Sequence, residues 1–466
     1  MNPVKPGELL SASRLDIFGK LPFAEVLASN GESAWARELF FECLRALNPN
    51  RLFSEDGVKF SEADYEYYFR KLMHSLDDKG FDPTLSKVLI SGDGTVWNGA
   101  HRVAASIALK QEVFVDQVEA TPQVYNWAFF SNSGMHRMYL DELAWQYALN
   151  VPSTRAIVLS DLTADDEFLI KRTLDRVESV VFERSIKLSG AGLRRNLQLM
   201  YGHLNWFSPS LLEKLVLERF SDPSDGNVTL FLCDQPAGLD ERTLKEELRS
   251  LIGGDQFERK IHGSDDWEET LRLAEVWTNG NSLRFMNSAP VGCEDRIINK
   301  LNSELKVGPN LLHDFVVDSG ASLELHGLRQ TADIDHVCIG EHPKTLSIIG
   351  DCHNSEYANL GVSASELVRD PRKHLRWGGF KFSTLESEFL RLRLLGTEKG
   401  YKDLATLLAR LTEQKGEVYF DADRSAKAAN WQRKSRWQIR MDRALAQLPP
   451  TVRALIARLA AAVRRT

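Results

Sequence analysis

Three aspartates within one short stretch of this chain could do chemistry together. Asp333 and Asp335 alternate within the segment Val316–Asp351, and Asp351 ends the apolar run that follows them. Alternate residues of a strand point to one face, so Asp333 and Asp335 should project together. If the two apolar runs form a hairpin centred near His342, Asp351 faces Asp333 on the same side. Because carboxylates this close repel each other without a cation, the pattern predicts a divalent-metal site for phosphoryl or nucleotidyl transfer.

A turn of small residues, Ser319-Gly320-Ala321-Ser322, lies about ten residues upstream of these acids, directly after an apolar strand. Tight turns present backbone N–H groups that can hold phosphate oxygens. We therefore expect Gly320 and Ser322 to contact the phosphates of a bound nucleotide.

The turn, the spacing and the third acid together resemble the nucleotidyltransferase (polymerase-β-like) superfamily. The resemblance covers roughly residues 302–411. It implies an enzyme that requires Mg²⁺ and uses ATP or another nucleoside triphosphate. It gives the catalytic and metal-holding roles to Asp333, Asp335 and Asp351, and makes Lys402 a further candidate for nucleotide binding.

A second motif that suits phosphate binding lies near the N-terminus, where Gly99-Ala100-His101-Arg102 follows a predicted hairpin. Glycine allows close approach of the backbone to a ligand, and the helix that begins here offers unpaired N–H groups. His101 and Arg102 add side-chain donors for anionic oxygens. Residues 65–116 or so resemble the ParB/sulfiredoxin-like superfamily, which implies that Gly99, His101 and Arg102 bind nucleotide in a kinase-like module.

The elements that must position these residues follow from apolar periodicity. Helical spacing predicts helices over 32–47, 60–76, 103–109, 138–149, 164–177, 241–251 and 267–276. Short apolar runs predict strands over 87–90, 95–97, 113–115, 156–159, 228–233 and 281–286. The alternation of strands and helices in the middle of the chain favours an α/β layer.

We therefore expect a multidomain α/β (α+β) protein with four regions. Residues 1–150 would form a ParB/sulfiredoxin-like nucleotide-binding domain, and residues 151–300 an α/β middle domain of unknown role. Residues 301–415 would form a nucleotidyltransferase-like domain with a mixed sheet. Residues 416–466 would form a basic amphipathic helical tail.

The composition is that of a soluble globular protein, with 43% hydrophobic and 26% charged residues. The five cysteines are scattered without a Cys-x-x-Cys motif. This pattern favours the reducing cytoplasm and argues against structural zinc. No apolar run reaches the length of about eighteen residues that spans a bilayer, and the N-terminus does not read as a signal peptide.

The charge of the chain is unevenly distributed. From Arg424 to Thr466, eleven Lys or Arg residues face one acid, Asp442, which gives +10. Because the whole chain carries −7, the remainder must carry −17. Residues 424–466 therefore suit an anionic partner. Three partners fit: an anionic membrane surface, the protein's own acidic body, or nucleic acid. The first would place a cytoplasmic protein peripherally at the inner membrane.

Together these patterns predict a magnesium-dependent nucleotidyl or phosphoryl transferase with a second, kinase-like nucleotide-binding module. Residues 302–411 look like sequences encoded with bacterial surface-polysaccharide enzymes, which favours a sugar or surface-polysaccharide precursor as acceptor. Two alternatives stay open: a toxin-like nucleotidyltransferase that modifies tRNA or protein, and a non-catalytic protein that senses nucleotides. The acidic body disfavours nucleic acid, and a complete set of three acids disfavours a role in binding alone.

Overall fold

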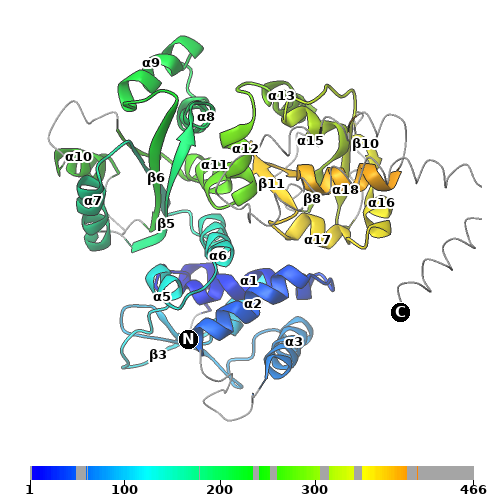
Figure 1. Ribbon diagram of the computed structural model, residues 1–466. Coiled ribbons are helices and arrows are strands. Elements are labelled where there is room, and N and C mark those ends of the chain that lie inside the picture. The colour runs from blue at the N-terminus through cyan, green and yellow to red at the C-terminus, as the bar shows by residue number, and fades with distance from the viewer. Residues whose placement is uncertain are drawn as a thin grey trace, which may run out of the picture. The chain divides into compact units, whose positions relative to one another are not determined.

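The structure is a computed structural model, and it describes residues 3–48, 59, 61–177, 179–234, 241–251, 260–304, 314–340, 349–395, 403 and 407. Helices and strands both contribute to the described part, and the strands form three sheets (Figure 1). The expected mixed α/β class is therefore confirmed. Among the described residues, no helix is both long and apolar enough to cross a membrane.

The N-terminal part, blue to cyan in Figure 1, combines a three-stranded sheet with helices. Its strand order is β2-β1-β3, and β1 is antiparallel to β2 but parallel to β3. The predicted hairpin is present and leads directly into a helix. The strands are β1 (Val88–Ile90), β2 (Val96–Asn98) and β3 (Val115–Gln117). The helices are η1 (Pro6–Leu9), α1 (Leu15–Ala28), α2 (Ala34–Leu47), α3 (Glu62–Lys79), α4 (Ala100–Ala108), α5 (Trp127–Asn132) and α6 (Arg137–Asn150).

The middle part is built on a four-stranded antiparallel sheet with the order β5-β6-β4-β7. Its faces are apolar and each is covered by helices, which is why both faces read as hydrophobic in sequence. The strands are β4 (Thr154–Ser160), β5 (Ser179–Ser189), β6 (Asp225–Asp234) and β7 (Ile261–Gly263). Helices α7 (Ala164–Val177) and α10 (Glu241–Leu251) pack on one face, and α8 (Gly190–Tyr201) and α11 (Trp267–Trp277) on the other. Helices α9 (Pro209–Arg219), α12 (Gly280–Ser288) and α13 (Asp295–Glu304) complete this part.

The strand predicted over residues 281–286 is wrong, because these residues belong to α12. The Asn279 side chain accepts a hydrogen bond from the Ser282 N–H and so caps the helix. The buried residues Leu283 and Met286 are three apart, which is the spacing of one helix face.

The part that carries the aspartates is a five-stranded mixed sheet with the order β10-β9-β8-β12-β11. The strands are β8 (Phe315–Val317), β9 (Ile334–Cys338), β10 (Ile349–Cys352), β11 (His374–Trp377) and β12 (Phe380–Ser383). Helix α15 (Ser319–Leu325) joins β8 to β9, which run antiparallel. Helices α16 (Asn354–Asn359), α17 (Ala364–Arg369) and α18 (Leu385–Leu395) follow in the chain.

The hairpin predicted for the second apolar run is wrong, because β10 pairs with β9 in parallel. Ile349 lies beside Ile334 and Cys352 beside His336, so Asp351 falls next to Asp335 and not opposite Asp333. Ten residues, 339–348, join the two strands. That connection is long for a hairpin loop of about 2–5 residues.

Residues 1–394 group into one compact unit. Within this unit, one cluster of buried side chains runs from Ala12 to Phe382. A buried ion pair of 2.9 Å between Arg376 and Glu142 also joins β11 to α6. The predicted boundaries near residues 150 and 300 stay predictions. Lys402 and the basic residues 424–466 lie outside the described residues.

Candidate functional site

Asp333, Asp335 and Asp351, here called the acidic face, come from the adjacent strands β9 and β10. Asp333 is exposed and lies directly before β9, and the buried Ile334, the first residue of the strand, separates it from the half-buried Asp335. The Asp351 N–H donates a hydrogen bond of 3.1 Å to Asp335 Oδ1. The Thr331 hydroxyl donates one of 2.9 Å to Asp333 Oδ1. The structure thus brings the three predicted acids to one region of the sheet.

Gly350 is the residue that lets the two strands approach at this point. A Cβ atom on Gly350 would lie 2.3 Å from Asp335 Oδ1 and 3.4 Å from Asp333 Cβ. Any side chain here would therefore displace the Asp335 carboxylate. Gly350 was missed in the sequence, although a glycine directly before an acid on a strand can mark close backbone approach.

The three carboxylates are not preassembled around one point. Among the described residues, the group of three possible metal ligands with atoms within 4.8 Å of one another is His336, Cys338 and Cys352, not the acids. The side chains of Asp333 and Asp351 are exposed, whereas Asp335 is half-buried and accepts a hydrogen bond from the β10 backbone. A cation at the acidic face would therefore have to draw these two side chains toward Asp335.

The small-residue turn has a different environment from the one predicted. Ser319 has a positive φ of 57°, and its N–H donates a hydrogen bond of 2.9 Å to Glu388 Oε1. Ser322 is fully buried, and its hydroxyl bonds to the Val317 carbonyl at 3.0 Å and to Ser383 Oγ at 2.9 Å. A phosphate contact from Ser322 would require these internal hydrogen bonds to break.

Gly320 is also enclosed by protein. A Cβ atom there would lie 2.4 Å from Arg329 Nη2 and 2.5 Å from Thr331 Oγ1. The Arg329 guanidinium therefore lies close to the α15 backbone at Gly320. The Thr331 hydroxyl, which bonds to Asp333, lies beside the same glycine. Contact of Gly320 with a triphosphate stays a prediction.

Glu388, from α18, is the buried acid that accepts the hydrogen bond from the Ser319 N–H at the start of the turn. Burial alone would raise the pKa of Glu388, but Arg391 and the bonds from Ser383 and Ser319 lower it below its usual range. Arg391 Nε lies 3.1 Å from Glu388 Oε2, and the Tyr357 hydroxyl donates to Oε1 over 3.1 Å. Glu388 is therefore an ionised internal partner for the start of α15. No sequence signal identified it, since it lies 69 residues from Ser319.

A second buried pair, Asp318 and His353, links the ends of β8 and β10. His353 Nδ1 lies 3.0 Å from Asp318 Oδ2. Burial raises the pKa of Asp318 to about 6 although His353 opposes the rise. Burial would lower the pKa of His353, but Asp318 raises it to about 9. At pH 7 the two groups therefore form an ion pair, which holds the strands on either side of β9 in place.

The side chains of the N-terminal motif, Gly99-Ala100-His101-Arg102, make contacts within the protein. The His101 ring packs edge-on against Phe40 and Phe69, with centroids 5.8 and 5.1 Å away. Burial lowers the pKa of His101 well below its usual value, so the ring is neutral at pH 7. Arg102 Nη1 donates to the Lys87 carbonyl. Gly99 has a φ of 114°, and its Cβ position lies 3.3 Å from Val88 Cα, so glycine is required there.

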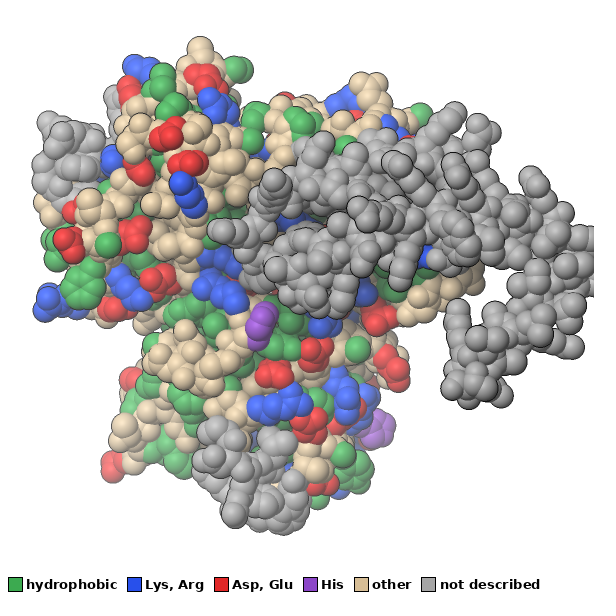
Figure 2. Space-filling view, in the orientation of Figure 1, with side chains coloured by type: hydrophobic (Ala, Val, Ile, Leu, Met, Phe, Trp, Pro, Cys, Tyr) green, Lys and Arg blue, Asp and Glu red, His purple; other side chains and the backbone are tan. Residues whose placement is uncertain are grey.

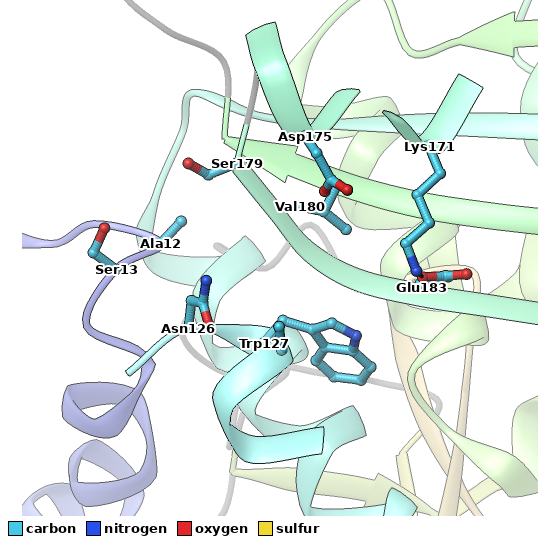
Figure 3. A pocket seen from close by; sticks show the side chains of 10 residues that line it. Ala12, Ser13, Asn126, Trp127, Lys171, Asp175, Ser179, Val180 and Glu183 are labelled. Carbon is cyan, nitrogen blue, oxygen red and sulfur yellow. Dashed lines mark hydrogen bonds and ion pairs between the residues drawn. The ribbon is translucent and has the colours of Figure 1, made fainter. Parts of the chain in front are cut away.

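Two hollows lined by described residues lie elsewhere. One, of about 200 Å³, is enclosed by the segment at Ser13, the start of α5 at Trp127, and α7 and β5, with the Lys171–Glu183 ion pair at its wall (Figure 3). The other, of about 410 Å³, is open and lies between η1 and the end of α4. None of the residues predicted to act on nucleotide lines either hollow.

Comparisons with known proteins identified no relative of this chain. No family model, no curated protein and no solved structure matches the chain.

Proposed function

We propose that the acidic face binds Mg²⁺ with a nucleoside triphosphate and transfers a nucleotidyl or phosphoryl group. The observation that carries this proposal is the parallel pairing of β10 with β9, which sets Asp351 beside Asp335 with a hydrogen bond between them. Asp333 lies immediately before β9, two residues from Asp335, and its Cβ atom lies near Gly350 of β10. Carboxylate oxygens are the ligands that Mg²⁺ prefers in proteins, so the donor set fits this cation.

The chain's own residues would position the reacting groups. Asp333, Asp335 and Asp351 would hold the cation, which when bound would neutralise phosphate charge and lower the pKa of an attacking hydroxyl. The Asp351 N–H and Thr331 hydroxyl fix the direction of two carboxylates. Arg329 and Thr331 both lie beside Gly320, and Thr331 bonds to Asp333 of the acidic face. Arg329 is therefore a candidate donor to the phosphate oxygens of a nucleotide bound there.

The acceptor in this proposal is a sugar or surface-polysaccharide precursor, on the sequence resemblance described above. On the face shown in Figure 2, the Lys and Arg side chains of the described residues are interspersed with Asp and Glu. A toxin-like enzyme that modifies tRNA or protein, and a nucleotide sensor without catalysis, are the alternatives that the experiment below separates.

The test uses the full chain, each nucleoside triphosphate, Mg²⁺ and a panel of acceptors that includes sugar phosphates, tRNA and protein, with products followed by phosphorus NMR. We expect turnover by the wild type, and its loss in Asp335→Asn. Gly350→Ala keeps all three acids but displaces Asp335, so turnover should fall about 10–100-fold. Asp165→Asn, an exposed acid on α7, is the matched control and should retain full turnover.

Two outcomes would contradict the proposal. Full activity in Asp335→Asn would place the chemistry elsewhere. Tight nucleotide binding by the wild type without turnover of any acceptor, tRNA and protein included, would favour the sensor.

A further inference from the structure

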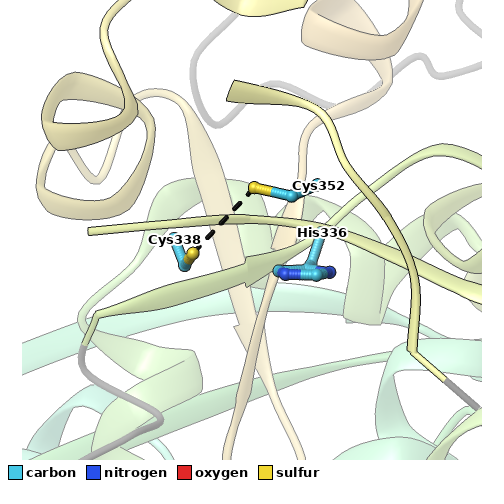
Figure 4. A group of neighbouring side chains, drawn as sticks. All are labelled: His336, Cys338 and Cys352. Atoms are coloured by element: carbon cyan, nitrogen blue, oxygen red, sulfur yellow. Dashed lines mark hydrogen bonds between the residues drawn. The ribbon is translucent and has the colours of Figure 1, made fainter. Parts of the chain in front are cut away.

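A second group of side chains with metal-binding chemistry lies on the other face of β9 and β10. His336 and Cys338 alternate with Asp335 along β9, and Cys352 follows Asp351 on β10, so these side chains point away from the acidic face. One ligand atom from each of His336, Cys338 and Cys352 lies within 4.8 Å of the other two. The two Sγ atoms are 4.0 Å apart (Figure 4).

The backbone around this group is fixed by contacts that leave the two sulfur atoms facing each other. The Asn354 side chain accepts from the Cys338 N–H at 3.2 Å and donates to the Cys338 carbonyl at 2.9 Å. The His353 N–H donates to the His336 carbonyl at 2.9 Å. The His336 ring stacks on Phe315, with centroids 5.0 Å apart and planes 24° from parallel. The three side chains are therefore held close together by the fold itself.

Both the spacing and the chemistry suit a zinc ion. Zinc binds thiolate sulfur at about 2.3 Å in a tetrahedral arrangement, which separates two sulfur ligands by about 3.8 Å. The observed 4.0 Å between Cys338 and Cys352 needs little change. Two thiolates and a neutral imidazole would cancel the charge of the ion, which matters because His336 is fully buried and Cys338 nearly so.

We propose that His336, Cys338 and Cys352 bind one zinc ion, with solvent in the fourth position beside the half-buried Cys352. Sulfur ligands select zinc over Mg²⁺, whereas the oxygen ligands of the acidic face select Mg²⁺. The zinc ion would join β10 to β9 and so hold Asp351 beside Asp335. The site was missed in the sequence because His-x-Cys and the third ligand are separated by thirteen residues, and the chain has no Cys-x-x-Cys.

The experiment titrates the full, reduced and metal-stripped chain with Co²⁺, whose absorption reports tetrahedral thiolate coordination. We expect one equivalent to bind with a thiolate-to-metal charge-transfer band that zinc then abolishes. Cys352→Ser should remove the band. Cys293→Ser is the matched control, because Cys293 is also half-buried but lies elsewhere, and it should keep the band. Asp335→Asn, on the opposite face, should keep it too, which separates this site from the proposed activity.

If Cys352→Ser failed to fold, it would lose the Co²⁺ band for that reason alone. A measurement on the wild type avoids this ambiguity. Alkylation of Cys352, followed by mass spectrometry of the full chain, should slow at least about tenfold when zinc is added. Alkylation of Cys293 should not change. The proposal is overturned if the reduced wild type gives no Co²⁺ band, if the band survives in Cys352→Ser, or if zinc leaves the labelling of Cys352 unchanged.

Discussion

Glu275 is a buried acid whose ionisation the fold opposes. It projects from α11, and its two carboxylate oxygens accept hydrogen bonds of 3.1 and 3.2 Å from the Gly379 N–H, in the turn between β11 and β12. Burial raises the pKa of Glu275 from 4.5 to about 7, and the bond from Gly379 offsets only part of that rise. The folded protein therefore holds this proton more tightly than the unfolded chain does. The resulting stabilisation is complete below pH 4.5 and is lost as the pH rises through about 7.

The change in pKa from 4.5 to about 7 corresponds to about 3 kcal/mol of unfolding free energy, at about 1.4 kcal/mol per pKa unit. Glu275→Gln keeps the size of the side chain and an oxygen acceptor for Gly379 but never ionises. We expect the variant to match the wild type at pH 4.5 and to exceed its stability by about 3 kcal/mol above pH 8.

Urea unfolding of both proteins across this pH range measures the difference directly. Glu268→Gln is the matched control, since Glu268 lies on the exposed side of the same helix and its replacement should leave the pH profile unchanged. If the stability curves of the wild type and Glu275→Gln stay parallel from acid to alkaline pH, Glu275 ionises freely in the folded protein and the reasoning fails.

Two further substitutions test the packing around the predicted phosphate-binding motifs, again by urea unfolding. Gly99→Ala should lower the free energy of unfolding by about 1–3 kcal/mol, because alanine disfavours a φ of 114° and its Cβ would crowd Val88. Gly7→Ala is the control: a Cβ there meets open space, so the free energy of unfolding should hardly change. Glu388→Ala leaves Arg391 without its buried partner and should cost about 3–5 kcal/mol. A cost below about 1 kcal/mol for either Gly99→Ala or Glu388→Ala would show that the contact matters little.

Local patterns were the reliable part of the sequence. The helices predicted over 164–177 and 241–251 coincide with α7 and α10. A helix depends on residues within one or two turns of each other, so apolar periodicity suffices to predict it.

Features that depend on distant residues were not predictable. The run ending at Asp351 was expected to return beside β9 as a hairpin, but strand direction depends on the whole sheet and not on the run itself. The turn at Ser322 bonds to Glu388 and Ser383, more than sixty residues away, and these contacts could not be predicted from the turn itself. The packing of His101 against Phe40 and Phe69 likewise could not be predicted from its motif. Phosphate binding by Ser322 and His101 stays a prediction.

Cation binding at the acidic face is the claim that most needs a direct measurement. Electron paramagnetic resonance can count the Mn²⁺ ions taken up by the full chain with a non-hydrolysable nucleoside triphosphate, after zinc has been added to saturation. We predict that the wild type binds Mn²⁺ and that Asp335→Asn weakens this binding at least about tenfold, while Asp165→Asn does not. A wild type that takes up no Mn²⁺, or that binds it no better than Asp335→Asn, would contradict the account.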